Sequence, residues 1–460
     1  MNKAQGLLAA LVAVLTLTGS GCGGGGYGAI LSPPPSYTLG GTVSGLAGSG
    51  LVLQNNGVAN GSTIGRAANG TYPNLTGDSL ANGTAYNVTV KTQPTNPSQT
   101  CVVTNGMGTI GSANITNIAV TCTTNADRFV YVANGGSNNI SAYAINAASG
   151  ALTAISGSPF PAGNVPYSMI VDPSGKFAYV ANQGNGNVSA FAIDGTIGTL
   201  TTVSGSPFAT GPVPFSVAVD PSSKFVYVTN GNSGNVSAYT TNPSSGALTA
   251  VSGSPFAAGN APYSVSVDPA GKFVYVANGG SNDVSAYTVN ASSGALTAVS
   301  GSPFGAGNGP RSVTVDPTGK FAYVANANSN SISAYTIDAT SGALTAVSGS
   351  PFMAGNVPYS VAVDPFGKFV YVANQVSNSI SAYTINAATG ALTAVNGSPF
   401  PAGSAPWSLT DPSGKFAYVA NASSSNISVY AIDASSGALT AVSGSPFAAG
   451  SLPYAVAVGH

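Results

Sequence analysis

The sequence predicts an all-β protein, a seven-bladed β-propeller preceded by a small β-sandwich. A unit of 48 residues occurs seven times, which predicts a repeat architecture. Each copy holds four short segments rich in Val, Tyr, Phe and Thr, the number of strands in one propeller blade. Residues 37–124 lack this repeat and instead show short alternating runs between Asn-Gly and Gly-Ser turns, which predicts the sandwich.

The repeat is followed most easily through its segment F-[VA]-Y-V-[AT]-N. The fourth copy predicts strands at 264–267, 272–277, 284–289 and 295–299, with a type I turn at Asp268-Pro269-Ala270-Gly271. One blade buries too little apolar surface to offset the entropy of ordering its backbone, so the blades must pack on one another. The segment begins at Phe129, Phe177, Phe225, Phe273, Phe321, Phe369 and Phe416, with one residue deleted before the last copy.

The two ends of the array predict how the ring closes. The array, residues 127–460, starts at a second strand, 128–133, and ends with an unmatched first strand, 454–458. We expect the last strand to complete the first blade, because this removes the exposed edge of an open ring.

The first 22 residues have the features of an export signal. Lys3 precedes an apolar run from Leu7 to Leu17, and small residues lead into Cys22. This resembles a bacterial lipoprotein signal, in which that cysteine becomes the lipidated first residue. Because Gly19 stands where such signals usually carry Leu, cleavage without lipid is the alternative. Residues 23–36 are expected to form a Gly/Pro-rich tether. Either route predicts the cell envelope: an outer-membrane or surface lipoprotein, or a periplasmic or secreted protein that contacts membrane through a lipid anchor only.

The predicted sandwich contains two cysteines. Cys101 and Cys122 lie near the ends of the candidate strands 100–104 and 117–123. Outside the cytoplasm they are most simply a disulfide, worth about 3 kcal/mol in the loop-entropy model. A metal site lacks further Cys or His ligands. The domain resembles small immunoglobulin-like modules that precede bacterial propellers, and this resemblance implies no activity.

The charge inventory excludes several functions. Only 5% of residues are charged, with 11 Lys and Arg against 12 acidic residues, all of them Asp. Without a basic footprint we expect no nucleic-acid partner. The aspartates are not spaced as in a calcium loop, and the Gly-rich runs lack the context of a phosphate loop, so we expect no metal and no cofactor.

The repeat resembles a known family. The run Phe225-Val226-Tyr227-Val228-Thr229-Asn230 is similar to the YVTN repeat, and the frame D-P-x-G-K-F-x-Y-V-x-N resembles the lactonase propellers that include 6-phosphogluconolactonase and fungal muconate cycloisomerases. This resemblance implies Arg, His and Glu at the mouth of the central channel.

The stretches that match those positions keep only part of the chemistry. They are Gly309-Pro310-Arg311-Ser312 and Asn326-Ala327, so Arg311 is kept while Ser312 and Ala327 replace His and Glu. Lactone hydrolysis needs a base to activate water and a group to stabilise the oxyanion. Arg311 is thus a weak catalytic candidate. We expect a non-catalytic binding or surface-interaction scaffold, with a lactonase acting on a sugar or related lactone as the alternative.

Arg311 also belongs to a set of seven equivalent residues, which follow Pro at the head of each first strand. Packing between blades would stack Arg311 on Tyr263 or Tyr359. Alternatively, the set forms an aromatic rim with one cation, suited to a sugar or small anion, and the partner is a glycan, a peptide or another envelope component. The seven ligand-binding candidates are Tyr167, Phe215, Tyr263, Arg311, Tyr359, Trp407 and Tyr454.

Overall fold

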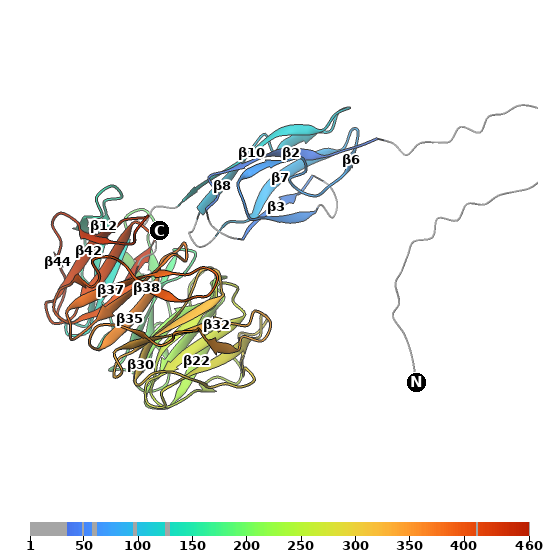
Figure 1. The fold of residues 1–460 in the computed structure, drawn as a ribbon. Coiled ribbons are helices and arrows are strands. Elements are labelled where there is room, and N and C mark those ends of the chain that lie inside the picture. The colour runs from blue at the N-terminus through green and yellow to red at the C-terminus, as the bar shows by residue number, and fades with distance from the viewer. Residues whose placement is uncertain are drawn as a thin grey trace, which may run out of the picture.

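The computed structural model describes residues 35–47, 50–57, 62–94, 99–124, 129–410 and 413–459. These residues form strands, turns and bends, and none of them is helical. A smaller β-body precedes a larger ring of sheets (Figure 1). The predicted signal, Cys22 and nearly all of the tether lie outside the described residues. Within the described part of the chain there is no helix that could cross a membrane.

The smaller body is the predicted sandwich. Two sheets of four strands, in the orders β5-β2-β10-β8 and β4-β3-β7-β9, are accompanied by the short pair β1-β6. Both sheets contribute to one core, in which Val43, Leu53, Val88 and Val120 are buried. The strands are β1 Ser36–Tyr37, β2 Leu39–Ser44, β3 Leu51–Asn55, β4 Thr63–Arg66, β5 Gly70–Tyr72, β6 Leu80–Ala81, β7 Ala85–Thr92, β8 Gln99–Thr104, β9 Met107–Thr109 and β10 Ile115–Thr124.

The predicted disulfide joins Cys101 to Cys122. The two residues lie directly opposite each other on the antiparallel strands β8 and β10. Both side chains are buried in the sandwich core. The bond therefore ties the last strand of the domain to its neighbour before the chain enters the propeller.

The larger body has seven blades, as the repeat predicts. Each blade is ordered from its inner strand at the channel to its fourth strand at the rim. The inner strands are β15 Pro166–Val171, β20 Pro214–Val219, β25 Pro262–Val267, β30 Pro310–Val315, β35 Pro358–Val363, β40 Pro406–Thr410 and β45 Pro453–Gly459. The second strands are β11 Phe129–Asn134, β16 Phe177–Asn182, β21 Phe225–Asn230, β26 Phe273–Asn278, β31 Phe321–Asn326, β36 Phe369–Asn374 and β41 Phe416–Asn421.

The third strands are longer, and they carry two short partners on their outer side. The third strands are β12 Asn139–Ile145, β17 Asn187–Ile193, β22 Asn235–Thr241, β27 Asp283–Val289, β32 Ser331–Ile337, β37 Ser379–Ile385 and β42 Asn426–Ile432. The fourth are β13 Leu152–Ala154, β18 Leu200–Thr202, β23 Leu248–Ala250, β28 Leu296–Ala298, β33 Leu344–Ala346, β38 Leu392–Ala394 and β43 Leu439–Ala441. The fifth are β14 Phe160–Pro161, β19 Phe208–Ala209, β24 Phe256–Ala257, β29 Phe304–Gly305, β34 Phe352–Met353, β39 Phe400–Pro401 and β44 Phe447–Ala448.

The fifth segment differs from the four strands that we predicted. In the fourth blade, β28 pairs with one end of β27 and β29 pairs with the other. The chain turns between them at Gly301, whose φ of 85° lies in the left-handed region that favours glycine. The hydroxyl of Ser302 in this turn accepts a hydrogen bond from the Ala286 amide at 2.9 Å. The outer edge of each blade thus consists of two short strands. Short edge strands limit pairing with the edge of another sheet.

The ring closes as expected. Strand β45 pairs with β11 from Phe129 opposite Gly459 to Asn134 opposite Pro453. The inner strand of the first blade therefore comes from the end of the chain. Buried tyrosines of the second strands reinforce the ring: Tyr323, for example, donates its hydroxyl to the Gly390 carbonyl of the next blade at 3.0 Å.

Candidate functional site

The candidate site begins with a β-bulge at the head of every inner strand. In the fifth blade, Pro310 pairs with Asn326 and Ser312 pairs with Ala325, so Arg311 is the extra residue. The same register shift occurs in the other six blades. A bulge leaves its extra residue unpaired and re-aims the side chain. The seven bulges therefore explain why these seven residues leave the regular ladder of the blade.

The residue before each of these prolines is in the left-handed region. In the fifth blade this residue is Gly309, with φ of 66°, whereas Val357 and Val165 adopt 54° and 51° in their blades. The carbonyl of Gly309 accepts the Ala327 amide at 2.9 Å, and its own amide donates to Asn282 at 2.8 Å. A β-branched residue in this region is strained, so the surrounding hydrogen bonds must hold the loop in place.

The seven side chains form one closed ring, which we call the collar. Five ring-to-ring contacts join its aromatic members, with centroids 5.1 Å apart for Tyr167–Phe215, 4.3 Å for Phe215–Tyr263, 4.1 Å for Tyr359–Trp407, 4.8 Å for Trp407–Tyr454 and 5.2 Å for Tyr454–Tyr167. Arg311 fills the remaining gap: its guanidinium carbon lies 3.7 Å from the Tyr263 ring centre and 5.5 Å from that of Tyr359. Arg311 thus contacts both of the tyrosines that we considered.

Collar residues from blades that are not neighbours also contact each other. The hydroxyls of Tyr167 and Tyr359, from the second and sixth blades, lie 2.8 Å apart, and the Tyr167 and Trp407 rings are 6.0 Å apart. Burial raises the pKa of Tyr167, and the neighbouring Tyr359 adds to the rise. Burial likewise raises the pKa of Tyr359. The two phenols therefore stay neutral at physiological pH, and the collar is a packed layer across the channel.

Two buried donors of the collar have no hydrogen-bond partner among the described residues. They are Nε of Arg311 and Nε1 of Trp407, on side chains that both contact the Tyr359 ring. Leaving a buried donor unpaired costs about 1–3 kcal/mol, and native proteins rarely do so without a bound water, ion or functional reason. Each of these two donors therefore needs an acceptor, either a bound water or an acceptor atom of a ligand.

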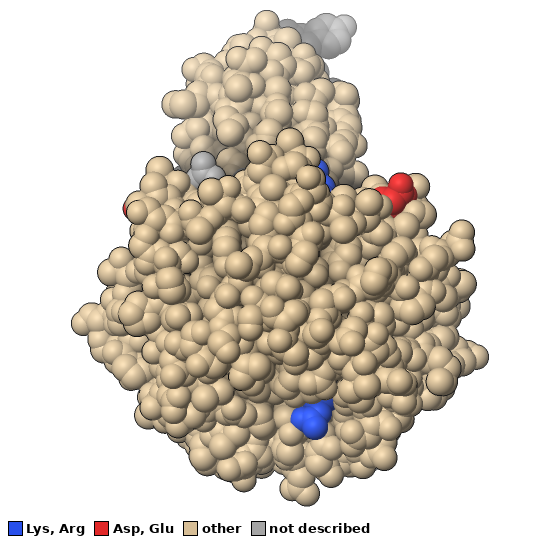
Figure 2. Space-filling model, turned by 90° about the vertical axis from the view of Figure 1, so that its left-hand side faces the viewer, with Lys and Arg blue, Asp and Glu red and all other residues tan. Residues whose placement is uncertain are grey.

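Carboxylates are scarce around the collar. Asp283 begins the third strand of the fourth blade, at the collar end, and its Oδ1 accepts hydrogen bonds from Asn278 at 2.7 Å and Ser281 at 3.1 Å. Asp316, in the turn that ends the first strand of the fifth blade, lies at the opposite end and accepts the amides of Lys320 and Phe321, both at 2.7 Å. Figure 2 shows how few charged side chains reach one side of the surface.

The residues that stand in place of the family's His and Glu have structural roles. The Ser312 hydroxyl accepts the Val361 amide of the next blade at 3.2 Å. Five further serines make the same inter-blade bond: Ser168, Ser216, Ser264, Ser360 and Ser408. Ala327 is only 2% exposed and supplies no side-chain polar group. The family's acid–base pair is therefore not replaced at these two positions.

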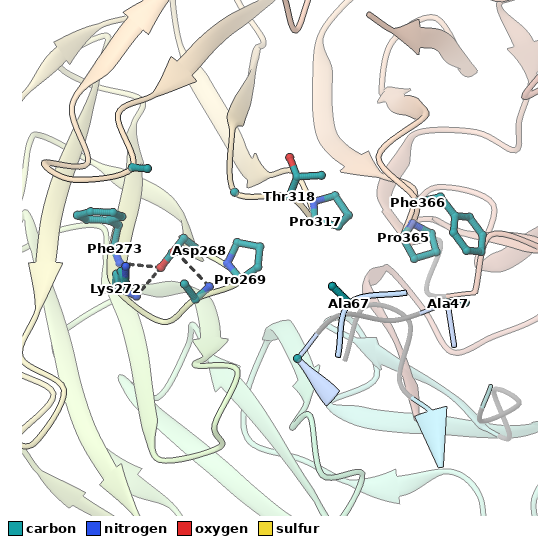
Figure 3. Close-up of a pocket in the computed structure, with 14 residues that line it drawn as sticks. Ala47, Ala67, Asp268, Pro269, Lys272, Phe273, Pro317, Thr318, Pro365 and Phe366 are labelled. Atoms are coloured by element: carbon teal, nitrogen blue, oxygen red, sulfur yellow. Dashed lines mark hydrogen bonds between the residues drawn. The ribbon is translucent and has the colours of Figure 1, made fainter. Parts of the chain in front are cut away.

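A cleft lies at the opposite end of the propeller (Figure 3). Its volume is about 620 Å³, and it is lined by turns of the fourth to sixth blades and by Ala47, Gly50 and Ala67 of the sandwich. Its one carboxylate, Asp268, accepts the amides of Ala270, Lys272 and Phe273 at 3.2, 2.6 and 2.7 Å. These bonds engage both of its oxygens, so this carboxylate holds its own turn in place. The described residues include no group of three metal-ligating side chains.

The sequence pattern did not identify Asp283 as a residue of the collar end. The one sequence feature that distinguishes Asp283 is a difference between the copies of the repeat. The same position carries Asn in four blades and Ser in two. In the structure, Asp283 lies at the end of the hairpin between β26 and β27, beside the collar. It does not lie in the turns at the opposite end of the propeller.

Comparisons with known proteins agree with this architecture. Many solved structures share the fold, and three of them are given as examples. A candidate 6-phosphogluconolactonase from Bacteroides uniformis is 21% identical with a TM-score of 0.64, covering 73% of this chain and 100% of that chain. A similar candidate from Bacteroides fragilis is 22% identical with a TM-score of 0.63, covering 74% and 99%. The periplasmic gluconolactonase of Pseudomonas aeruginosa is 19% identical with a TM-score of 0.62, covering 72% and 99%.

At such identities the likeness to these structures establishes the fold alone. No curated protein sequence matches the chain. The sequence profile of the lactonase, seven-bladed β-propeller family matches residues 89–217 and 265–456, which is more than half of the chain. The family match covers most of the propeller, and the structure has seven blades in a closed ring. This chain therefore belongs to the lactonase family of seven-bladed β-propellers.

Proposed function

We propose that this protein hydrolyses a sugar-type lactone at the collar. The observation that carries the proposal is Arg311, in a chain of the lactonase family: this cation is stacked between Tyr263 and Tyr359, and its Nε has no hydrogen-bond partner in the described part of the chain. Water attacks the lactone carbonyl carbon, the acyl C–O bond breaks, and the ring oxygen takes a proton to give the hydroxy acid. Charge develops on the carbonyl oxygen during the attack, and a guanidinium is suited to stabilise it.

The aromatic members of the collar support a sugar as the lactone. Tyrosine and tryptophan rings offer flat apolar surfaces together with polar edges, which match the C–H faces and hydroxyls of a sugar ring. Trp407 Nε1, from which no described residue accepts a hydrogen bond, is a second candidate donor for such a ligand. Binding there requires the ligand to reach a layer whose side chains are already half-buried against one another.

Activation of the attacking water needs a general base, and the collar side chains provide none. The chain has no Glu, and its one His is His460, outside the described residues. We therefore expect slow turnover whose rate follows hydroxide concentration and rises with pH, without the bell-shaped profile of a paired acid and base.

The test is a panel of sugar and aryl lactones assayed by acid release. Arg311→Met should lower kcat/KM by about 100-fold, the loss that follows removal of one oxyanion donor. Lys320→Met is the matched control, because Lys320 is an exposed cation in the first turn of the same blade, at the opposite end. Wild-type rates equal to those in buffer would reject the proposal.

A second candidate function is a non-catalytic binding scaffold for a glycan, peptide or envelope component. The missing family His and Glu, replaced by Ser312 and Ala327, favour it. It predicts saturable binding without turnover, weakened by Trp407→Ala and by Arg311→Ala. Binding can be measured by calorimetry against soluble glycans and peptides, and turnover of any lactone would argue for the first function instead.

We also propose that the chain is exported and anchored through Cys22, on the strength of the signal-like residues that precede it. Cys22→Ser should move the protein from the membrane to the soluble fraction of cells. Unchanged fractionation would leave export without a lipid anchor.

A further inference from the structure

We propose that Asp283 makes the collar end of the propeller selective for sugar acids and lactones that carry no phosphate. This inference rests on the proposed function only in taking the collar end as the binding face. It adds the class of ligand and the residue that sets it.

The charges of the propeller are divided unevenly between its two ends. Each inner strand runs away from the collar into a D-P-x-G-type turn, and the third strand runs the same way to a second turn. Among the described residues of the propeller, the lysines lie just after the first turn, and every aspartate except Asp283 lies in the first or second turn. The lysines are Lys176, Lys224, Lys272, Lys320, Lys368 and Lys415, and the aspartates are Asp172, Asp220, Asp268, Asp316, Asp364, Asp194, Asp338 and Asp433. In the described propeller, therefore, only Arg311 and Asp283 bring charge to the collar end.

The negative charge of Asp283 is not needed by the blade. In the first, second, third and seventh blades an asparagine holds this position, and its Oδ1 accepts the same hydrogen bond at 2.8 Å from the buried Asn at the end of the second strand. Asp283 Oδ1 does this at 2.7 Å. Its Oδ2 accepts no hydrogen bond from the described residues. Opposite Asp283 stands Gly305, where an added Cβ would meet no atom within 4 Å, so the space beside the carboxylate is open.

Contacts connect Asp283 to the collar cation. Arg311 stacks on Tyr263 of the fourth blade. The Tyr263 ring in turn lies against Gly279, where a Cβ would come within 2.6 Å of it. Gly279 belongs to the hairpin that joins β26 to β27 and ends at Asp283. A ligand held by Arg311 therefore lies beside the hairpin that carries the carboxylate.

These two charges treat phosphorylated and unphosphorylated ligands differently. A hydroxyl group can donate to Asp283 Oδ2, which a neutral polyol chain provides. A phosphate dianion is repelled by the carboxylate, and among the described residues of the propeller Arg311 is the single cation at this end that can offset the repulsion. Since Asp283 is partly exposed, screening keeps the effect of its charge moderate, about three- to tenfold in affinity at low salt.

The experiment compares gluconate with 6-phosphogluconate, which differ by the phosphate, on the full chain by calorimetry at low ionic strength. Asp283→Asn is the informative variant, because it installs the residue that four other blades carry and removes one charge. Asp338→Asn is the matched control: Asp338 is exposed at the opposite end, and Asn stands there in four blades.

We expect the wild-type protein to bind gluconate about three- to tenfold tighter than 6-phosphogluconate, and Asp283→Asn to remove most of this difference in affinity. Asp338→Asn should leave the ratio unchanged, and added salt should weaken the effect of Asp283→Asn. A preference for 6-phosphogluconate, an unchanged ratio in Asp283→Asn, an equal change in Asp338→Asn, or binding of neither compound would each overturn the inference.

These outcomes are separable from those of the proposed function. Selective binding without hydrolysis of any lactone keeps the role of Asp283 and rejects the lactonase. Hydrolysis of a lactone, together with the same ratio of gluconate to 6-phosphogluconate affinity in wild type and Asp283→Asn, keeps the lactonase and rejects the role of Asp283.

Discussion

The hydroxyls of Tyr167 and Tyr359 meet at 2.8 Å, although 192 residues separate them in the chain. One comes from the second blade and the other from the sixth. Their hydrogen bond joins two sides of the ring at the collar, where each blade otherwise contacts mainly its neighbours. The collar is for this reason a layer that couples distant blades.

Removing these two hydroxyls should have coupled effects on the free energy of unfolding. Tyr167→Phe leaves the Tyr359 hydroxyl half-buried without its partner, at a cost of about 1–3 kcal/mol, and Tyr359→Phe should act alike. The double variant removes both polar groups and should cost less than the sum of the two single changes. Denaturant unfolding of the four proteins measures the coupling, and additive effects would show that the bond contributes nothing.

The protein should lose stability in alkaline solution. Burial raises the pKa of the second-strand tyrosines, among them Tyr131, Tyr227 and Tyr323. In the unfolded chain tyrosine ionises near pH 10. The raised folded-state pKa therefore contributes stability that is complete below about pH 10 and is lost as pH rises further. As the pH rises above about 10, the thermal unfolding midpoint should fall, and the absorbance of the buried tyrosinates should appear together with unfolding. Ionisation of these buried tyrosines near pH 10 in the folded protein would contradict the prediction.

One serine bond missing from the inter-blade ring can be added. Ala455 occupies the position at which six other inner strands carry a serine that accepts an amide of the next blade. Ala455→Ser should raise the free energy of unfolding by about 0.5–1.5 kcal/mol, and Ser312→Ala should lower it by a similar amount. If Ser312→Ala instead abolished lactone turnover while stability stayed unchanged, its role would be chemical.

Deletion of residues 453–460 should open the ring. Strand β45 supplies the inner strand of the first blade and also the collar residue Tyr454. Its loss exposes the edge of β11 and the apolar surface beneath it, so we expect aggregation or a large drop in unfolding temperature. Size-exclusion chromatography and circular dichroism would report this, and a monomeric, equally stable product would contradict the closure. Val458→Ala, which trims one half-buried side chain and keeps the strand, is the milder control.

The repeat was sufficient to predict the blade count, because the strand pattern and turn residues recur at constant spacing and each blade needs neighbours to bury its faces. The unmatched last strand predicted the closure for the same reason, and the position of Cys101 and Cys122 near the ends of two candidate strands predicted their bond. The split outer strand was missed, because Gly301 and Ser302 interrupt pairing with the third strand after only three residues, a boundary that propensity does not reveal.

The sequence alone thus determined which residues are equivalent, including the seven of the collar, since equivalence follows from the period. Only the tertiary structure decided what they do together. The bulges release these side chains from the ladder, Tyr167 and Tyr359 meet through the closure of the ring, and Asp283 comes to the collar end because its strand starts there. These relationships depend on contacts between different blades, which a repeating pattern within each blade does not specify.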